Sequence, residues 1–86
     1  MPEISRFYGI VIRMFYNDHV PPHFHAIYGE HELIVGISPI AVLEGDAPAR
    51  VRSMVLEWAA LNQPSLIGDW ERCRRGEVPE KIAPLD

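Results

Sequence analysis

The first half of the chain repeats apolar side chains with a period of two residues, which predicts β-strands. Glycine and proline divide this half into short segments. Gly29-Glu30 predicts a two-residue turn with glycine first, and residues 17–22, with Pro21-Pro22, predict a loop of fairly fixed shape. The predicted strands, each rich in β-branched or aromatic residues, are 4–16 (one strand, or two short ones interrupted at Gly9), 24–28, 31–37 and 40–44.

The second half changes to a period of 3.6 residues, which predicts helices. The first helix is expected over residues 47–62, with Asp46 as its N-cap and Pro48 in its first turn. Pro64 predicts the start of a second helix, and Gly76 lies just past its expected end. The side chains expected to face inward are Val51, Met54, Val55, Trp58 and Leu61, then Leu66, Ile67, Trp70 and Cys73.

These elements together predict an α+β fold, with a three- or four-stranded antiparallel meander followed by a two-helix hairpin packed on one face. The meander is expected within residues 1–45, the helical hairpin within 46–76, and a partly ordered tail over 77–86. A chain of 86 residues has room for a single core, so residues 1–86 are expected to form one domain.

Net charge, cysteine content and the length of apolar runs exclude several classes of protein. A net charge of −4 argues against a general nucleic-acid binder, although it leaves room for a local basic patch. The single Cys73 excludes an internal disulfide and fits a reducing compartment. No apolar run approaches the roughly 18 residues of a membrane span, and residues 1–6 lack the apolar region of a signal peptide. We therefore expect a cytoplasmic protein with no membrane partner.

All four histidines lie in one short window, as His19, His23, His25 and His31. Histidine titrates near neutral pH and is the commonest metal ligand, so such crowding indicates a site. Side chains at i and i+2 of a strand point to the same face, which places His23 beside His25. The loop before them can fold Asp18 and His19 toward the same place.

The register across the predicted turn refines this geometry. Phe24 is expected opposite Val35 on the core face, so His23 and His25 would project from the face away from the helices. His25 would then lie diagonal to Glu32 on the neighbouring strand. His31, at the tip of the hairpin, belongs to the core side or to solvent.

An acid–base interpretation assigns catalysis to this face. His23 or His25 would be the general base, His19 the general acid, and Arg13 the cation that stabilises charge on a phosphate. Such a site is the apparatus of a metal-independent ribonuclease, for which no cofactor is expected. Further candidate binding residues are Asp18, Arg6, Arg72, Arg74 and Arg75.

Two other interpretations remain open. His19, His23 and His25 could bind zinc or another transition metal, completed by Asp18 or water. Alternatively, the histidines form ordinary hydrogen bonds to backbone, and the Pro-Pro-His-Phe-His segment is a rigid strand entry or a protein-binding edge. Trp58 and Trp70 are expected to be core residues under every interpretation.

Several motifs resemble one family of small bacterial proteins, the domain of unknown function 4160. The resemblance covers essentially the whole chain, and its most specific part is the Pro-Pro-His-Phe-His core. Val20 departs from it, since a polar residue is more usual there, and His31 and Cys73 lie outside it. The residues that carry it are Pro2 to Ile12, Tyr16-Asn17-Asp18-His19, Pro21-Pro22-His23-Phe24-His25, Tyr28-Gly29 and Leu56-Glu57-Trp58.

The resemblance implies a small cognate protein encoded nearby, in an arrangement of the toxin–antitoxin type, and assigns chemistry to no residue. The leading expectation is thus one component of such a pair, a candidate ribonuclease toxin that acts on RNA through its histidine cluster. The alternatives are a non-catalytic protein-binding module of such a pair and a three-histidine metal-binding domain.

Overall fold

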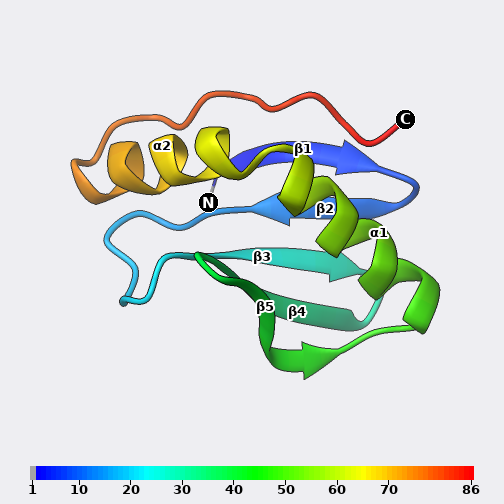
Figure 1. The fold of residues 1–86 in the computed structure, drawn as a ribbon. Helices are drawn as coiled ribbons and strands as arrows, with labels where there is room; N and C mark the ends of the chain where they lie inside the picture. The colour runs from blue at the N-terminus through cyan, green and yellow to red at the C-terminus, as the bar shows by residue number, and fades with distance from the viewer. Residues whose placement is uncertain (1) are drawn as a thin grey trace.

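The computed structural model describes residues 2–86, which form a five-stranded antiparallel sheet followed by two helices (Figure 1). The strands lie side by side in chain order, so the sheet is a simple meander. This confirms the α+β prediction. The elements are β1 (Glu3–Phe7), β2 (Ile10–Arg13), β3 (His23–Tyr28), β4 (His31–Ile37), β5 (Ile40–Asp46), α1 (Ala49–Leu61) and α2 (Gln63–Arg74).

The sheet has one strand more than expected because the first apolar segment folds back on itself. Tyr8 and Gly9 both have positive φ angles, of 51° and 80°, as the central pair of a tight hairpin turn requires. The chain therefore reverses at Gly9, and β2 pairs with β1. Of the two alternatives for residues 4–16, two short strands is the correct one.

The predicted register between β3 and β4 is confirmed. Phe24 pairs with Val35, and Tyr28 pairs with His31 on either side of the turn. Gly29 has a φ angle of 58°, which glycine adopts without steric cost. Phe24 and Val35 are fully buried, so this face of the sheet is the core face.

Both helices cover that face, and Trp58 of α1 is at the centre of the core. Its ring centroid lies 5.4 Å from that of Phe7 and 5.7 Å from that of Phe24. In Figure 1, α2 leads on from the end of α1 toward the other end of the sheet. Trp70 and Cys73 of α2 are buried as predicted, whereas Leu61, the last residue of α1, is exposed. Within residues 2–86, neither helix is long and apolar enough to cross a membrane.

The two helix ends differ in how well the sequence predicted them. Gly76 ends α2 as expected: its N–H donates to Cys73 O at 3.1 Å, and the N–H of Glu77 donates to Arg72 O at 2.8 Å. The predicted N-cap of α1 is wrong, because the helix begins at Ala49 and Pro48 is the cap. Asp46 ends β5 instead, and its Oδ1 accepts from the N–H of Ala47 and from the Arg52 guanidinium, with no hydrogen bond from its side chain to the first N–H groups of the helix.

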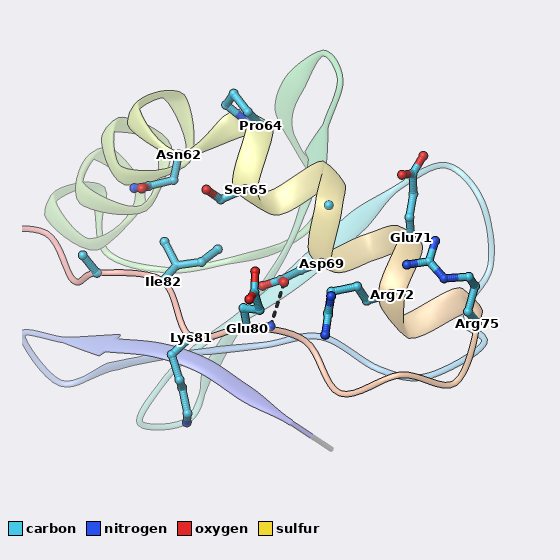
Figure 2. Close-up of a pocket in the computed structure, with 12 residues that line it drawn as sticks. Asn62, Pro64, Ser65, Asp69, Glu71, Arg72, Arg75, Glu80, Lys81 and Ile82 are labelled. Atoms are coloured by element: carbon cyan, nitrogen blue, oxygen red, sulfur yellow. Dashed lines mark hydrogen bonds between the residues drawn. The ribbon is translucent and has the colours of Figure 1, made fainter.

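The C-terminal segment, expected to be only partly ordered, packs along β1 and α2 without regular structure (Figure 1). The N–H of Ile82 donates to Ile4 O at 2.8 Å, and Trp58 Nε1–H donates to Ala83 O at 2.9 Å. Figure 2 shows the contact with α2, in which the N–H of Glu80 donates to the buried Asp69 carboxylate. The tail thus completes the core on the β1 side.

Candidate metal centre

The candidate site joins the loop between β2 and β3 to the start of β3. Asp18 comes from the loop, whereas His23 and His25 come from β3. The two histidines lie on the same face, as their spacing predicted, with ring centroids 5.3 Å apart. This arrangement brings three side chains with metal-binding atoms into one cluster.

One carboxylate oxygen of Asp18 contacts both imidazoles. Its Oδ2 lies 2.9 Å from Nε2 of His23 and 3.4 Å from Nε2 of His25. The other oxygen, Oδ1, accepts a hydrogen bond of 2.8 Å from the N–H of His19. Asp18 is thereby fixed by its own loop and directs Oδ2 toward β3.

The second nitrogen of each ring is held by a different acceptor. Nδ1–H of His23 donates to Pro21 O at 2.8 Å, and Nδ1 of His25 lies 2.9 Å from Oε2 of Glu32 on β4. The contact between His25 and Glu32 is the diagonal one that the register predicted. Contacts of this kind orient metal-binding imidazoles and leave Nε2 to face the ion.

Counting donors shows why a cation fits here. Carbonyl and carboxylate oxygens are acceptors only, so the Nε2 lone pair of a neutral His23 would face an oxygen of Asp18 at 2.9 Å. Either a proton on Nε2 or a metal ion between the two atoms removes this repulsion. Ligands about 2.1 Å from one ion, at angles of about 90–109°, lie about 3.0–3.4 Å apart. The distance from Asp18 Oδ2 to Nε2 of His25, 3.4 Å, lies in that range, and the distance to Nε2 of His23, 2.9 Å, lies just below it.

Packing shields the cluster from solvent. The side chains of His23, His25 and Asp18 are 10%, 12% and 19% exposed. The Phe15 ring lies edge-on against His25 at 4.4 Å between centroids, and Trp70 of α2 lies 5.2 Å from His23. Burial raises the pKa of Asp18, but the hydrogen bonds from the His19 N–H and the two imidazoles outweigh it and hold this pKa below its ordinary value.

The contact with Trp70 corrects one prediction. His23 does not project away from both helices, because the end of α2 reaches the loop that precedes β3. The N–H of Asn17 donates to Cys73 O across this junction, at 3.4 Å. The site therefore lies where the loop, the sheet and the end of α2 meet.

The structure brings together only part of the predicted histidine set. Asp18, His23 and His25 offer ligand atoms that all lie within 4.8 Å of one another, and His19 is outside this group. The side chain of Asp18 turns inward, and its neighbour His19 is exposed. His31 is also exposed, and its ring stacks on Tyr28 at 6.4 Å. A carboxylate thus occupies the place that the metal interpretation gave to a third imidazole.

The two arginines of the first strands lie at different distances from the cluster. Arg13 pairs directly with His25 in the register between β2 and β3, so it borders the site as expected. Arg6 lies one strand further away and is exposed. Its guanidinium donates two hydrogen bonds to Glu3, of 2.8 and 3.1 Å, and these lower the pKa of Glu3.

Arg72 and Arg74 lie in the last turn of α2, Arg75 follows as its C-cap, and two of these three arginines hold the tail. Arg72 donates to Val78 O, and Arg75 donates to the Glu77 carboxylate. Both line a cleft of about 580 Å³ between α2 and the tail, shown in Figure 2. Arg74 and Arg75 also line a second cleft together with Trp70, the residue that packs on His23. Of these two clefts, the second adjoins the histidine cluster through Trp70.

Sequence reasoning gave Asp18 and Glu32 too small a part. Asp18 is the residue on which both imidazoles converge, and Glu32 orients His25. The diagonal register was the signal for Glu32. The carbonyl of Pro21, which orients His23, left no signal in the side-chain pattern.

A comparison with protein-family models matches residues 9–71 to the domain of unknown function DUF4160. The match covers most of the chain, so the protein belongs to that family. It includes the loop, β3 and β4, and therefore every side chain of the candidate site. Comparisons with curated proteins and with solved structures gave no significant match.

Proposed function

We propose that this DUF4160 domain binds a divalent first-row transition-metal ion, with zinc as the ion of best fit, through Asp18, His23 and His25. The observation that carries the proposal is the convergence of both Nε2 atoms on one carboxylate oxygen, at 2.9 and 3.4 Å. Each Nδ1 is already engaged, by Pro21 O and by the Glu32 carboxylate. Inner ligands supported by such outer hydrogen bonds are typical of protein zinc sites.

The donor set selects the class of ion. Two imidazole nitrogens with one carboxylate oxygen suit Zn²⁺, Fe²⁺, Co²⁺ or Ni²⁺, whereas Ca²⁺ and Mg²⁺ prefer oxygen ligands alone. Cys73 is buried in the core and is outside the cluster, so no thiolate joins the set. Three protein ligands leave at least one coordination position for water or a small ligand.

A bound metal ion would link the loop before β3 to β3 itself. Asp18 belongs to the loop, and His23 and His25 belong to β3. The unfolded chain does not hold these groups together, so the free energy of binding adds to the stability of the fold. At 100 times the dissociation constant, a ligand adds about 2.7 kcal/mol, which raises the Tm of a domain of this size by about 10–20 °C.

The test is the metal content of untagged protein that is first loaded with one equivalent of Zn²⁺ and then exchanged into metal-free buffer. The wild type should retain close to one zinc per chain. Asp18→Ala and His25→Ala should retain less than about a tenth of that amount. His31→Ala is the matched control, because it removes an exposed imidazole outside the cluster, and it should retain the wild-type amount. Equal retention by all four proteins would refute the site.

A second candidate function is acid–base cleavage of RNA by one half of a toxin–antitoxin-type pair. It is favoured by the position of Arg13 directly across from His25, where a cation could stabilise phosphate charge. Asp18 and Glu32 each contact an imidazole, and such pairs orient histidine for proton transfer. This function ranks second because both nitrogens of each imidazole are engaged and both side chains are largely covered.

Regulated expression distinguishes the second function from its non-catalytic alternative. The chain is expressed alone and then together with its genomic neighbour, and growth and RNA integrity are measured. RNA cleavage that is lost in His25→Ala and suppressed by the neighbour would support the ribonuclease. A harmless chain that binds the neighbour would instead support a protein-binding module.

A further inference from the structure

The face of the sheet opposite the helices has an unusual composition. A sheet with one solvated face normally alternates apolar residues inward with polar residues outward. Here Val11, Ile27 and Ile34 lie on the outward face of the three central strands. Each is half-buried. The helices pack on the other face, and the loop before β3 covers one end of this face, where Phe15 packs against His25. We name this surface, centred on Val11, Ile27 and Ile34, the outer face.

Charges on the outer face are segregated by sign. Arg6 on β1 and Arg13 on β2 lie at one side, where Glu3 is bonded to Arg6. Three carboxylates, those of Glu32, Glu44 and Asp46, lie at the other side, on β4 and β5, where Asp46 is bonded to Arg52. The apolar residues lie between these two groups. The surface is therefore positive at one side, apolar in the middle and negative at the other.

We propose that the outer face binds a second copy of this chain, face to face, about a two-fold axis parallel to the strands. Such an axis lays β1 of one protomer over β5 of its partner and keeps β3 over β3. Ile27 then meets its own copy at the centre. Arg6 lies over the carboxylate of Asp46 in the second copy, so both sides of the interface pair opposite charges. An axis at right angles to the strands would oppose like charges.

The available area is adequate for a stable dimer. Five strands spaced about 4.8 Å apart and about 14–24 Å long give a face of roughly 400 Å² in projection. A corrugated surface exposes more, about 600–800 Å² per protomer, which approaches the roughly 800 Å² of a standard interface. Pairing through the free edge of β5 is disfavoured, because that strand contains a register shift and carries Glu44 and Asp46 near its end.

The test is sedimentation equilibrium from about 1 to 500 µM, with and without chelator. Wild-type protein should be dimeric in the upper part of this range. Arg6→Glu should weaken dimerisation at least tenfold, and adding Asp46→Arg should restore it to within about threefold. Arg50→Glu makes the same charge change on an exposed position of α1 and should have no effect.

Two results would overturn the proposal. Wild-type protein that is monomeric at about 500 µM would show that the outer face does not bind a second copy of the chain. A dimer that is equally stable in the wild type and in Arg6→Glu would place the interface elsewhere. Circular dichroism and a thermal melt establish that each variant folds, and both substituted side chains are exposed, so folding should be retained. The proposal does not depend on metal binding, so the dimer should form equally well with and without chelator.

Discussion

Asp18 Oδ2 lies 2.9 Å from Nε2 of His23, although the two residues belong to different elements, a loop and a strand. Nδ1–H of His23 donates to the backbone carbonyl of Pro21. If the imidazole were neutral, Nε2 would therefore carry no proton, and its lone pair would face the Asp18 carboxylate. The hydrogen bonds of the protein therefore leave a place for a positive charge between loop and strand.

Glu32→Gln should weaken zinc binding without abolishing it. Glu32 is not a ligand, but its carboxylate orients His25 and makes that imidazole a better donor. Loss of such a partner typically lowers metal affinity about 10–100-fold. Competition with a chromophoric chelator measures the change. Glu44→Gln is the control, since Glu44 lies on the same face across from Ile34, and it should bind as the wild type does.

His19→Ala should retain zinc, whereas His23→Ala should lose it. His19 is exposed and outside the cluster, and its contribution to Asp18 is made by its backbone N–H, which alanine keeps. The measurement is zinc per chain after gel filtration. Loss of zinc in His19→Ala would instead favour the three-histidine set that the sequence predicted.

Trp58→Ala should lower the free energy of unfolding by about 3–5 kcal/mol, as for other fully buried aromatic side chains. Trp58→Phe should cost less, because the ring contacts with Phe7 and Phe24 are largely kept and only the hydrogen bond to Ala83 O is lost. Urea denaturation measures both values. Equal costs for the two substitutions would show that the ring contacts are unimportant.

Asp69→Asn should stabilise the protein near neutral pH relative to the wild type. Burial raises the pKa of Asp69 and outweighs the hydrogen bond from the Glu80 N–H, which lowers it; the Glu80 carboxylate adds to the increase, and Arg72 opposes it. A folded-state pKa above the unfolded value means that the folded protein binds the proton more tightly. The contribution of this group is thus fully present below the ordinary pKa near 3.8 and is lost as pH rises through the raised value.

Denaturation at pH 4 and pH 7 measures this difference. The advantage of Asp69→Asn should be largest at pH 7 and should shrink toward pH 4, because a raised pKa means that the wild-type carboxyl takes up its proton as the pH falls toward 3.8. The amide oxygen can still accept from the Glu80 N–H, so the tail contact is retained. A stability difference between Asp69→Asn and the wild type that is the same at pH 7 and pH 4 would contradict the expectation.

The sequence predicted those parts of the fold that depend on local period. Alternation alone placed Phe24 opposite Val35 and predicted the diagonal between His25 and Glu32, because register in a two-residue hairpin is set by the turn. The end of α2 at Gly76 could also be predicted, since glycine is favoured where φ is positive.

Features that depend on contacts between residues far apart in the chain could not be predicted from the sequence. The contact between His23 and Trp70 requires the position of α2 relative to the loop, which neither segment encodes alone. The order of the tail depends on its hydrogen bonds to Ile4 and Trp58, more than twenty residues away in sequence. The choice of Asp18 over His19 depends on how the loop turns, because adjacent residues there offer equally plausible ligands.

The most direct measurement is a crystal structure of the zinc-loaded protein with data collected on both sides of the zinc absorption edge. We expect one anomalous peak per chain, about 2.0–2.2 Å from Asp18 Oδ2 and from Nε2 of His23 and His25. Nδ1 of each histidine should keep its present partner. A peak bound to His19 or His31, or zinc-soaked crystals with no anomalous peak between the loop and β3, would contradict the proposed metal centre.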